Sequence, residues 1–184
     1  ETEKYAHVTY FFNCGEEQPP AGEARILVPS PSVATYDQEP AMSAAGITDH
    51  LTNDLKTRRH DVIVCNFANA DMVGHTGQLD ATIAAVETLD RCLERIVASA
   101  RQAGGTVIIT ADHGNAERMW DAERNGPHTA HTTNPVPMLF IGPDVKAGMP
   151  LAAGSLRDVA PTMLGVLGIE PSPEMTGRDL REWR

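Results

Sequence analysis

The chain has 184 residues, of which 41% are hydrophobic and 22% are charged, so it is long enough for one sizeable hydrophobic core and has the composition of an ordinary globular domain. Its formal net charge of -10 at pH 7 and its lack of a clustered Lys/Arg tract argue against non-specific binding to nucleic acid or to an anionic membrane surface. The apolar runs are too short to span a bilayer, and the charged start at Glu1–Lys4 does not have the pattern of a signal peptide.

The cysteines indicate the cellular compartment. Cys14, Cys65 and Cys92 are odd in number and show no CxxC spacing, a pattern that favours reduced thiols over disulfides or a zinc site. We therefore expect a cytoplasmic protein. Because Cys65 lies in an apolar run of β type, it is expected to belong to the core.

Two short strands and a helix are predicted in the first third of the chain. Tyr5–Phe12 is β-branched and aromatic, and Arg25–Val28 is a second apolar run that ends at a proline. The segment from Pro29 to Pro40 has too many proline and serine residues for regular structure. The residues from Ser43 to Lys56 then have the pattern of a helix.

A strand, a long helix and a second strand are predicted in the middle of the chain. Val62–Phe67 is nearly continuous in apolar residues, as in a central strand covered on both faces. Leu79–Ala103 is followed by two glycines and carries an apolar face at helical spacing that consists of Ile83, Val86, Leu89, Leu93, Ile96, Val97 and Ala100. Thr106–Thr110 has the pattern of a buried strand. A right-handed crossover would make these strands parallel and bring the residues that follow each of them to one edge of the sheet.

The last third of the chain predicts one more strand and one more helix. Val136–Gly142 has the pattern of a strand, with its proline near the start. Ser155 is a plausible N-cap for a helix that ends at Leu167, before Gly168. Because no repeat, low-complexity linker or long run of like charge interrupts the sequence, a single domain is expected.

Four of the seven histidines fall in three segments that also suit a metal ion. Asp112 and His113 are adjacent at the predicted end of a strand, and His75 follows Asp71 by four residues. His131 lies three residues after His128, in the loop before the last strand. A single Asp/His pair is common on protein surfaces, but three such segments in one short chain favour a metal site.

Several long segments together resemble one known family, and they occur in its order. These segments are Glu3–Thr9, Val33–Asp37, Asn66–Gly77, Thr110–Glu117 and His128–Pro137. They are similar to the C-terminal part of the cofactor-independent (2,3-bisphosphoglycerate-independent) phosphoglycerate mutases. The resemblance implies an α/β fold of the alkaline-phosphatase type, with a mostly parallel sheet and helices on both faces. It also implies two manganese ions and the glycolytic interconversion of 3-phosphoglycerate and 2-phosphoglycerate through a phosphoserine.

The resemblance assigns roles to individual residues. Asp71, His75 and His131 resemble the ligands of one manganese ion, and Asp112 and His113 resemble part of the ligand set of the other. A separate position, Lys4, resembles a lysine that contacts the substrate phosphate, which suits a flexible ammonium group. Mixed carboxylate and imidazole ligands suit manganese, and zinc or cobalt are possible substitutes. His128 is expected to support the loop without binding the ion itself.

The family pattern also has parts that this sequence does not match. The N-terminal piece with the nucleophilic serine and the inserted phosphotransferase domain are absent, so residues 1–184 are expected to be the C-terminal segment of the metal-binding phosphatase-type domain, with an incomplete sheet. Ser30 and Ser32 lie in a Pro-rich loop and are interpreted as turn residues. The segment alone is therefore expected to be inactive. Cys14 stands where the family usually has the first of two glycines, and a positive φ there would strain it.

Two alternatives stay open at this point. One is a metal-dependent phosphohydrolase of the same superfamily, which would release phosphate to water. The other is a metal-binding fragment without catalytic function. The expected partners are the two phosphoglycerates, with no nucleic acid and no membrane, and the expected state is a monomer.

Overall fold

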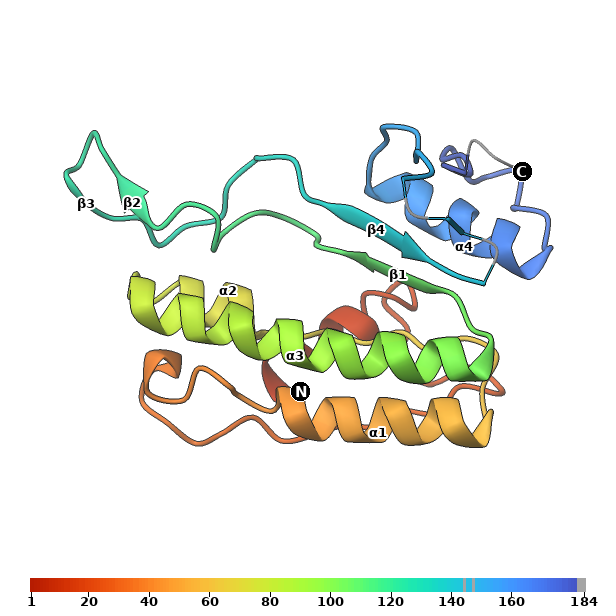
Figure 1. Ribbon diagram of the computed structural model, residues 1–184, viewed down its shortest axis with the longest axis horizontal. Helices are drawn as coiled ribbons and strands as arrows, with labels where there is room; N and C mark the ends of the chain where they lie inside the picture. The colour runs from red at the N-terminus through yellow and green to blue at the C-terminus, as the bar shows by residue number, and fades with distance from the viewer. Residues whose placement is uncertain (144, 147, 182–184) are drawn as a thin grey trace. The chain divides into compact units, whose positions relative to one another are not determined.

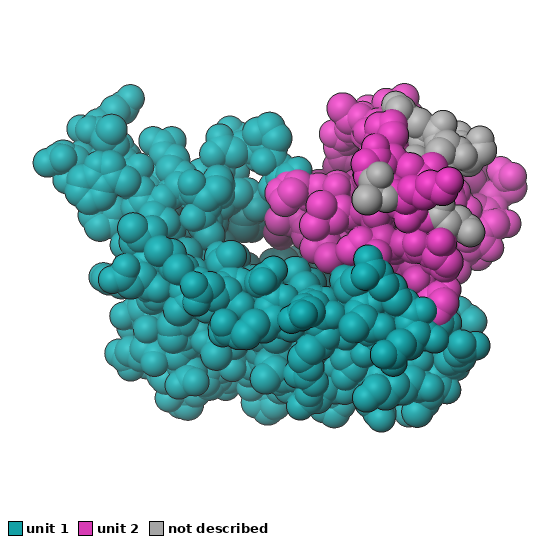
Figure 2. Space-filling model, in the orientation of Figure 1, with its two compact units in different colours: residues 1–103, 113–136 teal, residues 104–112, 137–184 magenta. Residues whose placement is uncertain are grey.

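The computed structural model describes residues 1–143, 145–146 and 148–181. The chain divides into two compact units, shown in different colours in Figure 2, with residues 1–103 and 113–136 in unit 1 and residues 104–112 and 137–184 in unit 2. The elements in chain order (Figure 1) are η1 (Thr2–Val8), η2 (Tyr36–Gln38), α1 (Ala44–Thr57), α2 (Asn69–Gly74), α3 (Leu79–Ala103), β1 (Val107–Thr110), β2 (Trp120–Asp121), β3 (Gly126–Pro127), β4 (Met138–Ile141), η3 (Leu156–Asp158) and α4 (Val159–Leu167).

The helices α1 and α3 of unit 1 lie side by side (Figure 1), and both confirm the helices predicted from sequence. One stripe of α3 is buried, and it consists of Thr82, Ala85, Cys92, Ile96 and Ala100. Ile83 and Val86 belong to the predicted apolar face, but they are 49% and 47% exposed. The buried face is therefore rotated from the predicted one in the first part of α3, where it carries Thr82 and Ala85, whereas Ile96 and Ala100 of the predicted face are buried.

The short helix α2 is fixed in the core of unit 1. Val73 of α2 is fully buried in a cluster with Met42, Ala68 and Ala85. Asn69, also fully buried, donates hydrogen bonds from its side-chain amide to the carbonyl oxygens of residues 40 and 41, at 2.9 and 2.8 Å. Buried side-chain amides are stable only when paired, so these bonds hold the start of α2 in place. The same helix carries Asp71.

Three predicted strands of unit 1 do not form. Tyr5–Phe12 is η1 and the turns after it, closed by local bonds such as Phe11 N–H to the Ala6 carbonyl at 2.9 Å. Neither Arg25–Val28 nor Val62–Phe67 is a strand in the described part of the chain. A strand needs a neighbouring backbone for its N–H and C=O groups, and composition alone does not provide one.

The first four residues of the segment Val62–Phe67 are exposed to solvent. Val62 is 44% exposed and Val64 is 39% exposed. Cys65 is exposed as well, so its predicted place in the core is wrong. Cys14, Cys65 and Cys92 are all free thiols, as the odd number and the spacing indicated.

Unit 2 contains the two longer strands. β1 and β4 pair in antiparallel fashion, with Val107 opposite Ile141. Both strands confirm predicted segments, but the predicted parallel partner for β1 at residues 62–67 is wrong, because that segment forms no ladder with it. The last helix also confirms its prediction, since Ser155 and Asp158 form a capping box and Gly168 ends α4 with a φ of 68°.

The structure also bears on the predictions for Cys14, for the serines of the Pro-rich loop and for a membrane-spanning segment. Cys14 has a φ of 56°, so it does occupy the left-handed region in which glycine is favoured. Ser30 and Ser32 are not in a hydrogen-bonded β-turn, contrary to their interpretation from sequence, and the Ser30 hydroxyl donates to a Glu1 carboxylate oxygen, 29 residues away in sequence, at 2.9 Å. Among the described residues, none of the helices has the length and apolar character required to cross a membrane.

Candidate metal centre

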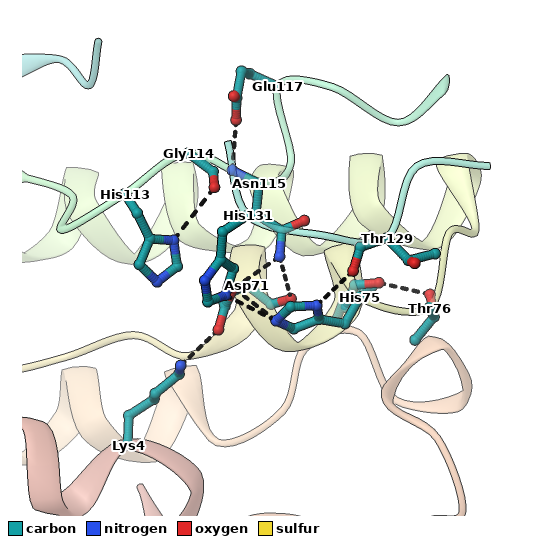
Figure 3. Close-up of polar contacts among 11 residues, drawn as sticks. Lys4, Asp71, His75, Thr76, His113, Gly114, Asn115, Glu117, Thr129 and His131 are labelled. Carbon is teal, nitrogen blue, oxygen red and sulfur yellow. Dashed lines mark hydrogen bonds and ion pairs between the residues drawn. The ribbon is translucent and has the colours of Figure 1, made fainter. Parts of the chain in front are cut away.

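Side chains from separate segments of unit 1 converge in one place (Figure 3). Lys4 comes from η1 and Asp71 from α2, and His75 directly follows α2. His113 and His131 come from the loops at residues 113–119 and 128–136. The fold thus brings together five of the six residues that the sequence proposed for the site.

Three potential ligand atoms form a nearly equilateral triangle. Asp71 Oδ1 lies 3.1 Å from His75 Nε2 and 3.0 Å from His131 Nε2. The two Nε2 atoms are 3.1 Å apart. Atoms about 2.1 Å from one ion lie about 3.0 Å apart at neighbouring octahedral positions and about 3.4 Å apart at tetrahedral ones. The spacing therefore fits one face of an octahedral coordination shell.

The orientation of His75 shows which of its nitrogens is available to an ion. Its Nδ1 lies 2.8 Å from the carbonyl oxygen of Thr129, an atom that can only accept, so Nδ1 carries the proton. In the neutral ring, Nε2 then presents a lone pair to the anionic Asp71 Oδ1. Two acceptors in contact require a shared proton or a cation between them. A backbone carbonyl that fixes the tautomer in this way is typical of metal-binding histidines.

His113 extends the group on the other side of His131. Their rings stack with centroids 3.7 Å apart and an interplanar angle of 24°. Asp71, His113 and His131 each offer one ligand atom, and these atoms all lie within 4.8 Å of one another. Asp112 belongs to unit 2 and is not in this group. Its pairing with His113 at a second ion stays a prediction.

Asp71 is held as an anion by its neighbours. Burial is the largest influence and raises its pKa, but hydrogen bonds from Lys4 and Asn115 and the charge of Lys4 outweigh it and lower the pKa to about 2. Lys4 Nζ donates to Asp71 Oδ2 at 2.6 Å, and the two side chains are only 12% and 14% exposed. The carboxylate therefore offers Oδ1 to the imidazoles while Oδ2 is held by the ammonium group.

Asn115 supports Asp71 and was not identified from sequence as a site residue. Its side-chain amide donates to Asp71 Oδ1 at 2.7 Å and to the Asp71 carbonyl at 3.2 Å. A Cβ at Gly74 would lie 2.6 Å from Asn115 Oδ1, so the close approach requires glycine at position 74. The only sequence signal was the position of Asn115 inside the segment Thr110–Glu117.

Glu117 was also missed, and it connects the two histidine loops. The hydrogen bond from the Thr132 hydroxyl is the largest influence on the pKa of Glu117 and lowers it. Burial raises this pKa, but further hydrogen bonds, which include one from the side-chain amide of Asn134, keep it lowered. Glu117 is therefore a carboxylate acceptor near neutral pH. Its contacts span loops 15 and 17 residues apart in sequence, which no local pattern reveals.

His128 lies outside the converging group. Its backbone N–H donates to the Met119 carbonyl at 3.0 Å, which joins β3 to the loop before β2. Its buried Nδ1 has no hydrogen-bond partner among the described residues. These contacts agree with a role in loop structure.

Comparisons with known proteins give one consistent result. A family model described as "Metalloenzyme superfamily" matches residues 1–171. The 2,3-bisphosphoglycerate-independent phosphoglycerate mutase of Nitrosococcus oceani is 56% identical over 182 residues, which are 99% of this chain and 35% of the relative. The corresponding protein of Methylobacillus flagellatus is 58% identical over 180 residues, 98% of this chain and 35% of the relative.

A solved structure agrees with these sequence relatives. A crystal structure of Leishmania mexicana phosphoglycerate mutase at low cobalt concentration matches with a TM-score of 0.86 and 34% identity, over 97% of this chain and 35% of that one. The chain thus spans about 35% of the length of the relatives it matches. The comparisons confirm the resemblance and the partial α/β fold that it implied.

Proposed function

The chain belongs to the metalloenzyme superfamily, and from this premise we propose that it is the metal-binding part of a phosphoglycerate mutase that interconverts 3-phosphoglycerate and 2-phosphoglycerate through a phosphoserine. The observation that carries the proposal is the triangle of Asp71 Oδ1, His75 Nε2 and His131 Nε2, in which atoms that would otherwise repel lie 3.0–3.1 Å apart. The mutase names of the relatives support this reaction over phosphate hydrolysis.

In this proposal, Asp71, His75 and His131 hold one divalent ion. Asp112 and His113 contribute to a second. The mixed oxygen and nitrogen ligands suit manganese, with cobalt or zinc as substitutes, and cobalt is named for the crystals of a relative. We propose, from the family resemblance and the 35% of its relatives that the chain spans, that residues 1–184 form the C-terminal segment of a metal-binding domain of the phosphatase type.

When bound, the ions supply positive charge that clamps phosphate oxygens and stabilises charge on the entering and leaving oxygens. The residues of the chain contribute positioning. The 2.6 Å hydrogen bond that Lys4 Nζ donates to Asp71 Oδ2 keeps the ammonium group beside the ligand triangle, where it can bind a substrate phosphate as a point charge. The Thr129 carbonyl keeps the His75 lone pair directed into the triangle.

Free thiols at all three cysteines and the mutase relatives support a cytoplasmic, glycolytic enzyme. We propose that it acts as a monomer on small phosphorylated acids and needs neither nucleic acid nor a membrane. The net charge of -10 agrees with this, since it disfavours polyanionic partners.

A chimera tests the proposed reaction. This chain would replace the matching C-terminal part of the Nitrosococcus oceani mutase, to which it is 56% identical. With manganese, we expect 2-phosphoglycerate to form in an assay coupled to enolase, and the Asp71→Asn chimera to be inactive at equal metal concentration. A folded, metal-loaded chimera that releases only inorganic phosphate would identify a phosphohydrolase instead.

The 184-residue chain alone should not turn over phosphoglycerates, whatever metal is supplied. It spans about 35% of the length of its relatives, and the segment that carries the nucleophilic serine of the family has no counterpart in the sequence. A phosphoserine route requires a hydroxyl beside the ions. Turnover near the ~10 per second of a median enzyme, removed by Asp71→Ala, would contradict this expectation.

A further inference from the structure

The Glu117 carboxylate holds three partners from two loops of unit 1. Its Oε2 accepts the backbone N–H of Asn115 at 2.6 Å. Its Oε1 accepts the side-chain amide of Asn134 at 2.8 Å and a short hydrogen bond from the Thr132 hydroxyl. One exposed acid thus joins the loop of His113 to the loop of His131.

A backbone contact places these bonds next to two candidate ligands. Gly114 and Thr132 form an antiparallel bridge, with Thr132 N–H donating to the Gly114 carbonyl at 2.8 Å. Gly114 directly follows His113, and Thr132 directly follows His131. A Cβ at Gly114 would overlap Thr132 Oγ1 and Glu117 Oε1, so this crossing admits only glycine.

The third candidate ligand is reached through Asn115. Its backbone N–H is held by Glu117, and its side-chain amide donates to both oxygens of Asp71 that face it, the carboxylate Oδ1 and the main-chain carbonyl (Figure 3). Asn115 is only 4% exposed, so it has little freedom to take another position. Movement of the Glu117 carboxylate would therefore be transmitted to Asp71 as well as to both histidine loops.

We propose that Glu117 is a positioning residue that sets the mutual spacing of Asp71, His113 and His131 for metal binding. This inference rests on the proposed metal site and adds a residue that would not touch the ion. The carboxylate is exposed to solvent and acts through intermediate residues. Its effect should therefore lie near the low end of the 10- to 100-fold loss in affinity that supporting residues give, at about 10-fold.

Titration of the metal-free 184-residue chain with Co²⁺, followed by visible absorption, tests the proposal. Glu117→Gln should weaken cobalt binding about 10-fold and change the ligand-field spectrum. The matched control is Glu123→Gln, an exposed glutamate of the same unit whose replacement changes the net charge equally. It should leave affinity and spectrum unchanged.

A second pair of variants covers the case in which Glu117→Gln does not fold. Thr132→Val removes the hydroxyl donor and should weaken binding, whereas Thr132→Ser keeps it and should restore affinity. Where Glu117→Gln folds, it can be combined with Thr132→Val. The losses of cobalt affinity in the two single variants should then not add in the double variant, because both substitutions break the same contact.

The outcomes separate this inference from the proposed function. If the unmodified chain shows no saturable cobalt binding, the metal site fails and the positioning role fails with it. If the chain binds cobalt but Glu117→Gln and Thr132→Val bind it within twofold of the unmodified chain, the positioning role alone is refuted. An equal loss in Glu123→Gln would also refute it, since charge would then explain the effect.

Discussion

Replacing Gly74 by alanine should destabilise the metal-free chain, although this change in a helix interior normally stabilises by about 1 kcal/mol. Gly74 ends α2, and an added Cβ would lie 2.6 Å from Asn115 Oδ1 and 3.0 Å from its Cγ. Asn115 is 4% exposed and must shift, so it loses its 2.7 Å bond to the Asp71 carboxylate. A hydrogen bond to a charged group contributes about 1.5–3 kcal/mol, which outweighs the helix gain. We expect a net loss of about 1 kcal/mol.

Urea denaturation of the metal-free chain measures this change in the free energy of unfolding. The control is the same substitution in an Asn115→Ala background, where the clashing amide is gone. There Gly74→Ala should recover a stabilisation of about 1 kcal/mol. A stabilising effect of Gly74→Ala in the unmodified background would refute the reasoning, since it would show that Asn115 is not held against the helix.

Three further predictions concern other parts of the chain. Cys14→Gly should raise the free energy of unfolding by about 1 kcal/mol, because Cys14 has a φ of 56° and glycine adopts this conformation without strain. Cys14→Ala removes the thiol but keeps the Cβ, so its urea midpoint should stay that of the unmodified chain. An equal stabilisation by both substitutions would assign the effect to the thiol and not to the backbone. In the active chimera, His131→Ala should remove most mutase activity. His128→Ala should lower the activity about 10- to 100-fold, and excess manganese should restore it better than in His131→Ala. A larger loss in His128→Ala than in His131→Ala in the coupled assay would contradict the ligand assignment. Hydrogen bonds from the backbone N–H groups of Ser155 and then Arg178 lower the pKa of Asp158. The ionised Asp158 carboxylate therefore stabilises the folded chain fully above about pH 4, and this contribution is lost as the pH falls through the lowered pKa. Asp158→Asn should flatten this acid-side loss in urea midpoints measured from pH 7 to pH 2, and an unchanged pH profile would contradict it.

The helices α1, α3 and α4 could be predicted because their signals are local, whereas the short helix α2 was not predicted. In α3, apolar spacing and the glycines after Ala103 gave both ends of the helix. Even there, the buried face was set by partners: α1 and α2 both contact α3, and Ala85 and Cys92 are buried while Ile83 is half exposed. Periodicity thus predicts a helix better than it predicts which residues the helix buries.

The strands show what sequence pattern omits. Val62–Phe67 and Val107–Thr110 have similar apolar composition, but only the second is paired, with β4. Pairing is a property of two segments, and the 62–67 segment has no partner in the described part of the chain. Tyr5–Phe12 forms local turns instead, because bonds within the segment satisfy its backbone.

In the candidate metal centre, too, the sequence predicted some residues and omitted others. Asp71, His75 and His131 are of recognisable metal-ligand types in resembling motifs, and the fold brings them within 3.1 Å of one another. Asn115 and Glu117 are common polar residues, and their importance depends on which loops face each other. No spacing rule predicts a contact between Glu117 and a residue 17 positions away.

The most direct test of the account is a calorimetric titration of the metal-free chain with Mn²⁺. We predict a tightest site that is lost in His131→Ala and in Asp71→Asn and is kept in Asp112→Ala, because in the proposed assignment Asp71, His75 and His131 supply three ligands to that ion and Asp112 supplies none. A second, weaker binding event should be the one that depends on Asp112. If Asp112→Ala abolished the tightest site while His131→Ala left it intact, the assignment of Asp71, His75 and His131 to one ion would be wrong.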